Sequence, residues 1–251
     1  MIVERDIKKY EENYSQDACG FEKYKIIYRR RKILEIINEF QPRSILEIGC
    51  GPEPLFCYEK DKEFTIVEPS VKFYENAKRL SHPNQNVRCI RGFFEEVAHN
   101  LQEEKIIYDM VVCSSLLHEV TEPKELLEAI KRVSGKETII HISVPNMHSV
   151  HRLLGVQMEL LSGVFDMSEG NNRLQQNTNF DMCKLKDMVE SVGMQVEEEG
   201  SYFVKPFSHK QMEEMVEKQI IDDHVLDGLY KLTEYMPQFG SEIYVNCKIT
   251  T

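Results

Sequence analysis

Two glycines and an acid near residue 50 have the residue types and spacing of a nucleotide-binding site. Residues 44–48 form a short apolar run that contains Glu47, and this run leads directly into Gly49, Cys50 and Gly51. The run predicts a buried parallel strand. Glycine can adopt the positive φ that a sharp turn needs, and without a Cβ it lets a ligand lie against the backbone. An acid and a glycine turn at the carboxyl end of a strand favour a nucleotide site.

Known nucleotide-binding motifs narrow this interpretation. The dinucleotide motif G-x-G-x-x-G would need glycine at position 54, which is Pro54, and the sequence has no G-K-[ST] phosphate loop. The stretch instead resembles the E/D-x-G-x-G-x-G motif of the class I S-adenosylmethionine-dependent methyltransferases. Glu47, Gly49 and Gly51 fit that motif, whereas Glu53 stands where the family has its last glycine. A buried strand that ends in a plain glycine turn, without a ligand, is the alternative.

A second acid follows the next apolar run, at residues 64–67. This acid is Glu68, and at a strand end it can accept hydrogen bonds from both ribose hydroxyls of an adenosine. The resemblance implies that the loop after residues 86–90 lies against the adenine, where Phe93 and Phe94 offer a stacking surface. The alternative is that both phenylalanines pack in the hydrophobic core. The expected cofactor-binding residues are Glu47, Gly49, Cys50, Gly51, Glu68, Pro69, Phe93, Phe94, Ser114 and Ser115.

Histidine and glutamate follow the fourth predicted strand, at residues 106–113. The resemblance implies that this segment faces the transferred methyl group, and it carries His118 and Glu119. Histidine suits general-base chemistry near neutral pH because its unperturbed pKa is about 6.5. We therefore expect His118 to act as the base and Glu119 to orient it, and the alternative for Glu119 is that it helps to bind a metal.

A further pair of histidines follows the fifth predicted strand, at residues 137–144. The sequence from Val144 through Arg152 resembles the branch that includes ubiquinone-type and surface-polysaccharide O-methyltransferases. If this segment is helical, His148, His151 and Arg152 share one face near a helix N-terminus, which favours anions. Such a cationic patch suggests an anionic acceptor, and partly exposed histidines without this role are the alternative. His148 and His151 are further catalytic candidates, and the expected substrate-binding residues are Tyr14, Asn146 and Arg152.

Composition excludes several other classes of protein. The net charge of −11 argues against non-specific nucleic-acid binding, because the phosphate backbone dominates that affinity. No stretch of about 18 apolar residues could span a membrane. The N-terminus is charged and lacks a secretion signal. Seven cysteines without a C-x-x-C pair favour reduced thiols, and we expect a cytoplasmic protein with no metal site.

Hydrophobic periodicity predicts an α/β fold. The resemblance implies a Rossmann-like doubly wound sheet of about seven strands, mostly parallel with an antiparallel last strand, and helices on both faces. We expect an N-terminal helical cap over residues 1–41, a methyltransferase domain over residues 42–251, and a lid or acceptor-binding insert at about 147–180. The basic run from Arg29 to Lys32 lies within a predicted helix and is interpreted as its solvated face.

These expectations combine into one functional hypothesis. The chain would transfer the methyl group of S-adenosylmethionine to an oxygen of a small anionic acceptor. A sugar, a nucleotide-linked sugar or another phosphate-bearing precursor of a surface polysaccharide would suit. A quinone-like metabolite, an amine acceptor, a non-catalytic cofactor-binding module and a nucleotide-binding oxidoreductase are the alternatives. The expected partner is the small-molecule acceptor alone, and the expected oligomeric state is monomer or homodimer.

Overall fold

A single mixed β-sheet forms the centre of the computed structural model, which describes residues 6–8, 11, 20–81, 86–166 and 177–250. The strand order across the sheet is β3-β2-β1-β4-β5-β7-β6. Their bounds are β1 Ser44–Ile48, β2 Glu63–Glu68, β3 Val87–Arg91, β4 Tyr108–Ser114, β5 Ser134–Pro145, β6 Met194–Tyr202 and β7 Glu242–Ile249. The predicted doubly wound, Rossmann-like sheet is confirmed.

Strand β7 lies between β5 and β6 and is antiparallel to both. The pairs β1–β2, β1–β4, β2–β3 and β4–β5 are all parallel. The carboxyl ends of β1, β2 and β4 therefore meet at one edge of the sheet, as the nucleotide-site hypothesis requires. The antiparallel last strand was also predicted correctly.

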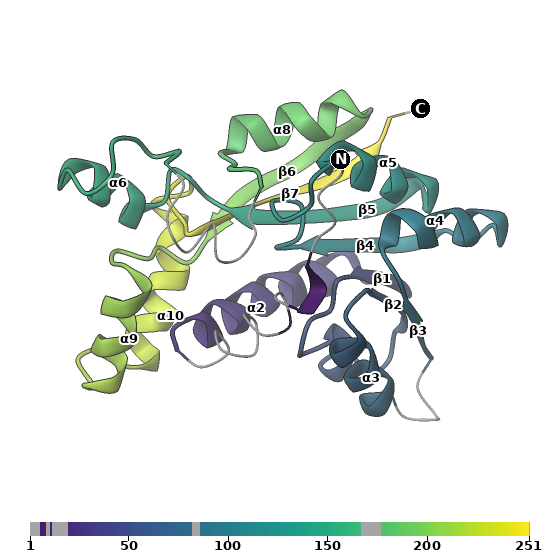
Figure 1. The fold of residues 1–251 in the computed structure, drawn as a ribbon, viewed down its shortest axis with the longest axis horizontal. Helices are drawn as coiled ribbons and strands as arrows, with labels where there is room; N and C mark the ends of the chain where they lie inside the picture. The colour runs from purple at the N-terminus through teal and green to yellow at the C-terminus, as the bar shows by residue number, and fades with distance from the viewer. Residues whose placement is uncertain (1–5, 9–10, 12–19, 82–85, 167–176, 251) are drawn as a thin grey trace.

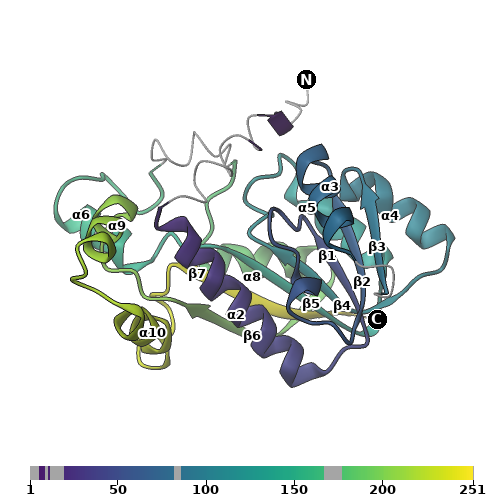
Figure 2. The same ribbon diagram turned by 90° about the horizontal axis from the view of Figure 1, so that it is seen from below.

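Helices cover both faces of the sheet (Figures 1 and 2). One face packs against α4 Phe94–Glu103, α5 Pro123–Arg132 and α8 Met182–Ser191. The other packs against α2 Glu22–Phe40, α3 Val71–Leu80, α10 Asp223–Lys231 and the short 3-10 helix η1 Leu55–Cys57. Each interface is a continuous hydrophobic core, so both sheet faces are buried, as expected for parallel strands.

Several helix starts follow from local sequence. Ser70 caps α3 by accepting a hydrogen bond from Phe73 N, and Asp181 caps α8 by accepting one from Lys184 N. Short polar side chains suit this role because they satisfy the free N–H groups of a first turn. Helix α5 begins with Pro123 after Glu122, and proline is favoured at a first helical position.

Three helices lie at the end of the sheet beyond β5 and β6. They are α6 Val150–Gln157, which falls within the expected insert, α9 His209–Glu217 and α10, which η2 Leu232–Glu234 follows. Helix α2 runs along one sheet face, from beside α9 to the loop that precedes β1 (Figure 2). Residues 22–40 therefore share the core of the sheet, and the domain boundary at residue 41 remains a prediction. None of the helices in the described ranges is long and apolar enough to cross a bilayer.

Candidate active site

The turn after β1 has the backbone geometry that its glycines predict. Gly49 has a φ of +74° and Gly51 a φ of +57°, both in the left-handed region. A Cβ added to Gly51 would meet nothing within 4 Å, so the backbone borders open space. Glu53 is not among the residues with positive φ, and hence its position does not require the glycine that the family motif has there.

Glu68 lies fully buried at the end of β2, directly beside this turn. Its Oε2 accepts a hydrogen bond from Gly51 N at 3.1 Å, and its Oε1 accepts one from Ser70 N at 2.9 Å. Cys50 Sγ lies 3.8 Å from the same Oε2. The carboxylate thus joins the two strand ends at which we predicted the cofactor. Pro69, the next residue, is partly buried.

Glu47 points its carboxyl group into the same region from β1. The side chain is buried, and its Oε2 accepts a hydrogen bond from Leu55 N at 3.0 Å. Burial raises the pKa of Glu47 to about 8, and the charge of Glu68 adds to this effect. A carboxyl group that keeps its proton near neutral pH is a frequent sign of a functional site.

A cleft opens in front of the turn. The cleft is lined by six of the predicted cofactor-binding residues, namely Glu47, Gly49, Cys50, Gly51, Ser114 and Ser115. Ser115 has a φ of +53°, a strained conformation of the kind that clusters at functional sites.

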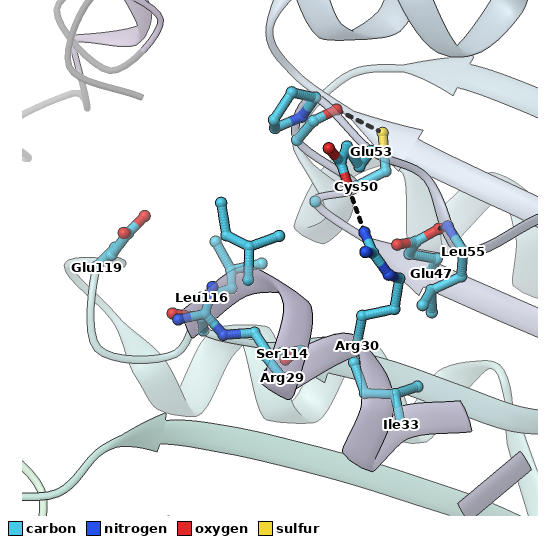
Figure 3. A pocket seen from close by; sticks show the side chains of 15 residues that line it. Arg29, Arg30, Ile33, Glu47, Cys50, Glu53, Leu55, Ser114, Leu116 and Glu119 are labelled. Atoms are coloured by element: carbon cyan, nitrogen blue, oxygen red, sulfur yellow. Dashed lines mark hydrogen bonds and ion pairs between the residues drawn. The ribbon is translucent and has the colours of Figure 1, made fainter. Parts of the chain in front are cut away.

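Helix α2 forms the other wall of the cleft, which sequence reasoning missed. Arg29 and Arg30 line it, and Figure 3 shows Arg30 extending from the helix to an ion pair with Glu53. The Arg30 guanidinium also lies 3.9 Å from the centre of the Tyr58 ring, and Tyr58 donates a hydrogen bond to Glu53. The residue that replaces the family glycine therefore anchors α2 across the cleft.

The prediction of a solvated basic face was wrong for Arg29. Its side chain is 11% exposed, and its guanidinium donates two hydrogen bonds to the fully buried Glu242, one from Nε at 2.9 Å. Lys25 Nζ and the Tyr202 hydroxyl also contact Glu242, at 3.2 and 2.6 Å. The partner lies 213 residues away in sequence, so no local pattern could have indicated this burial.

His118 and Glu119 lie on the loop that follows β4, and both are buried. Their side chains are close, with His118 Nε2 3.8 Å from Glu119 Oε1. Glu119 lines the cleft, and Figure 3 shows it on a separate loop from the glycine turn. Asn177 braces this loop, since its N donates to His118 O at 2.9 Å and its Nδ2 to Glu119 O at 2.7 Å. The predicted base and its predicted partner are therefore neighbours beside the cleft.

The structure separates the two phenylalanines expected at the adenine. Phe94 is 3% exposed and packs in the core between the sheet and α4. Phe93 directly precedes α4 and is partly exposed. Phe94 thus has the packing role that was the alternative at this position, and we keep the adenine proposal for Phe93.

The prediction that His148, His151 and Arg152 form a cationic patch on one helix face was wrong. His148 lies before α6 rather than within it. Burial and the nearby Lys205 hold the pKa of His151 well below its usual range, which leaves it neutral. Arg152 is 7% exposed and donates to two backbone carbonyls, Val164 O at 2.7 Å and Asp166 O at 2.5 Å. It therefore fixes the segment after α6.

Asn146 and Tyr14 were the other residues predicted to bind the substrate. Asn146 is 2% exposed, its Nδ2 donates to Gln238 O and Gly240 O, and its Oδ1 accepts from His148 N. Its amide is engaged in holding the chain together, so we do not retain it as a substrate ligand. Tyr14 lies outside the described residues.

A seven-stranded sheet with one antiparallel strand, a glycine turn after β1 and an acid ending β2 define a class I S-adenosylmethionine-dependent methyltransferase. Residues 22–219 match the model of a methyltransferase domain family, and the chain belongs to this family. S-adenosylmethionine is accordingly its cofactor, which was the prediction. No curated protein sequence matches the chain.

Solved structures of methyltransferases share the fold at low sequence identity. The plantazolicin methyltransferase BamL, in complex with a triazolic desmethylPZN analog and S-adenosylhomocysteine, is 16% identical. Each chain covers 98% of the other, with a TM-score of 0.58. A possible histamine N-methyltransferase from Thermotoga maritima is 14% identical, with coverage of 96% and 98% and a TM-score of 0.59. A methyltransferase from Archaeoglobus fulgidus is 16% identical, with coverage of 90% and 94% and a TM-score of 0.55.

The residues at the cleft fit the cofactor. The open space beside Gly51 lets a ligand approach the backbone, and Glu68 is a buried acceptor at the end of the adjacent strand. The cofactor-binding assignments themselves remain proposals.

Proposed function

We propose that this methyltransferase methylates an oxygen atom of a small anionic acceptor, with His118 as the general base. The buried pair of His118 and Glu119 beside the cofactor cleft is the observation that supports this proposal most directly. A hydroxyl group must lose its proton as it is methylated, whereas an uncharged amine already has a free lone pair. A positioned histidine with a carboxylate neighbour is suited to remove that proton.

The chemistry requires little more than alignment and proton removal. S-adenosylmethionine supplies an activated methyl group with a good leaving group. The protein then holds the acceptor oxygen in line with that group, and such positioning contributes on the order of 7–11 kcal/mol. The acceptor proton passes to the His118 imidazole, and the Glu119 carboxylate 3.8 Å away stabilises the imidazolium that forms. General-base catalysis of this kind is worth roughly 10²–10⁴-fold in rate.

The resemblance of residues 144–152 to polysaccharide and ubiquinone-type O-methyltransferases supports a proposal for the acceptor class. We propose a hydroxylated, phosphate-bearing compound such as a sugar phosphate or a nucleotide-linked sugar. An amine acceptor is the second candidate, because one of the structures with this fold is described as a possible histamine N-methyltransferase.

The test measures production of S-adenosylhomocysteine with sugar phosphates, nucleotide-linked sugars, neutral sugars, quinols and amines. We expect turnover with the phosphate-bearing hydroxyl compounds. His118→Gln should then lower kcat by roughly 10²–10⁴-fold without changing the Kd for S-adenosylhomocysteine. His224→Gln, an exposed histidine on α10, is the matched control and should keep the wild-type rate.

Three outcomes would contradict the proposal. Turnover with amines alone would replace O-methylation by N-methylation. A His118→Gln variant with the wild-type kcat would remove His118 as the base. Binding of S-adenosylhomocysteine without product from any acceptor would favour a non-catalytic cofactor-binding module.

A further inference from the structure

Lys205 is a buried lysine just beyond β6, at the edge of the sheet where the cofactor cleft lies. Only 1% of the residue is exposed, and it ranks among the largest fully buried side chains. Its Nζ lies 2.8 Å from Nδ1 of His209, the first residue of α9. Lysine is almost never fully buried unless it is paired with an opposite charge. This residue therefore needs an explanation that packing alone does not give.

The nearby carboxylates are already committed to other cations. Glu242 contacts Arg29 and Lys25. Glu22 lies 3.6 Å from Lys25, 3.5 Å from Arg29 and 3.2 Å from His209 Nε2. Lys205 forms no ion pair with a carboxylate anywhere in the described part of the chain.

Two cations and two carboxylates face Lys205, so a charged Lys205 would leave this set of groups with an excess positive charge. The groups that face Lys205 come from α2, α6, α9 and β7, and they are Glu22, Lys25, His151, Arg152, His209 and Glu242. Burial, together with Lys25 and Arg152, lowers the pKa of Lys205 well below its usual range. An ammonium group in this position costs several kcal/mol unless an anion compensates it.

His151 adds a second unsatisfied group at the same place. Its Nδ1 is shielded from solvent and has no hydrogen-bond partner among the described residues. Buried polar atoms are nearly always paired, so an orphaned one indicates a missing partner. The His209 side chain is 49% exposed, which gives this group of residues an opening to solvent.

The position of these residues relative to the cofactor cleft suits an acceptor. Helix α2 carries Glu22 beside His209 at its start and Arg29 in the wall of the cleft. These two residues are seven positions apart, which corresponds to roughly 10 Å along a helix. A small molecule with an anionic group at one end could therefore reach the cleft with the other end.

We propose that Lys205, His209 and His151 bind the anionic group of the methyl acceptor, a phosphate or a carboxylate. We call these three residues the anion cluster. The proposal rests on the proposed function, because it assigns a site to the charge of the acceptor. It also replaces the patch of His148, His151 and Arg152 as the site of that charge. An anion placed there would pair with the Lys205 ammonium and accept a hydrogen bond from His151.

The experiment measures calorimetric binding of phenyl phosphate, benzoate and benzyl alcohol to the full chain, with and without saturating S-adenosylhomocysteine. Phenyl phosphate and benzoate present the two candidate anionic groups on the same ring, and benzyl alcohol lacks the charge. We expect one anion to bind and benzyl alcohol not to bind. Lys205→Met should weaken that binding by at least about tenfold, since it removes a charged hydrogen-bond donor.

Matched variants keep the test decisive. Lys218→Met removes an exposed lysine at the end of α9 and should leave anion binding unchanged. His209→Gln alters the half-exposed member of the cluster and should weaken binding even where Lys205→Met fails to fold. Anion binding to the wild type should also take up protons, visible as a buffer-dependent enthalpy, and this uptake should disappear in Lys205→Met.

The outcomes separate this proposal from the proposed function. Wild-type protein that binds neither anion, or that binds it equally well after Lys205→Met and His209→Gln, overturns the anion cluster. Failure of the proposed function has a different signature, namely anion binding that depends on Lys205 while methyl transfer goes only to amines.

Discussion

The carboxylate of Glu68 accepts a hydrogen bond from the backbone N–H of Gly51 at 3.1 Å, so the end of β2 and the turn after β1 form one unit. Gly51 can present its N–H in this way because its φ is +57°. The contact aligns the carboxylate that we assign to the ribose with the backbone that we assign to the rest of the cofactor. Each half of the site therefore depends on the other.

Replacing this carboxylate should weaken cofactor binding. Glu68→Gln puts an amide group where both oxygens now accept hydrogen bonds, from Gly51 N and Ser70 N. We expect the Kd for S-adenosylhomocysteine to rise by roughly 10–100-fold, the value of one charge-assisted hydrogen bond. Calorimetry would measure it. Glu63→Gln, at the exposed start of the same strand, is the control, and an unchanged Kd in Glu68→Gln would refute the ribose assignment.

The two neighbouring phenylalanines should respond differently to truncation. Phe94→Ala removes a core side chain and should lower the free energy of unfolding by about 3–5 kcal/mol. Phe93→Ala should change stability much less but weaken binding of adenosine-containing ligands, because Phe93 is partly exposed. Urea unfolding and calorimetry together separate these effects. Equal cofactor affinity in Phe93→Ala and wild type would end the adenine proposal.

Glu47 should make the protein less stable as the pH rises. Its folded pKa is raised to about 8, above the ordinary 4.5. Between these values the folded chain keeps a proton that the unfolded chain releases, so stability is fully present below pH 4.5 and falls by up to about 1.4 kcal/mol per pH unit up to pH 8. Glu47→Gln should remove this fall. Urea unfolding at pH 5.5 and pH 8.5 would measure the free energy of unfolding of wild type and Glu47→Gln. An equal change in this free energy between the two pH values in both proteins would contradict the prediction.

Breaking the buried ion pairs of Glu242 should be costly. Although burial opposes ionisation, Arg29 and Lys25 hold the pKa of Glu242 at about 2, so it is charged at neutral pH. Glu242→Gln would leave both cations without this partner, and we expect a loss of about 3–5 kcal/mol in unfolding free energy.

The control for this substitution is the exposed pair of Glu137 and Lys248. Glu137→Gln should change stability by less than about 1 kcal/mol, because solvent screens such pairs. If the two substitutions lower the free energy of unfolding by similar amounts, the buried pairs stabilise the protein no more than an exposed pair does.

The fold was predictable from sequence because its signals are local. The runs at residues 44–48, 64–68 and 106–113 predicted three central strands, each within two residues of its observed bounds. Capping by Ser70 and Asp181 depends only on the next three residues. The glycine turn could be placed because its residue types are required by backbone geometry.

The walls of the site were less predictable because their contacts are distant in sequence. Arg29 was interpreted as solvated, yet it meets Glu242 from the far end of the chain. Lys205 carries no motif, and its burial follows from how α2, α6 and α9 converge. The histidines after β5 were expected to be cationic because charge was read from residue type, whereas burial makes His151 neutral.

The place of β7 in the sheet sets the order in which the protein can complete its fold during synthesis. Strand β6 pairs with β7, and β7 also pairs with β5. While a ribosome is still making residues 242–249, β6 therefore has no neighbour to join, and β5 presents a bare edge to other nascent chains. Such an edge invites aggregation. Assembly of this half of the sheet must await the emergence of β7, and a chain truncated before Glu242 should fail to fold.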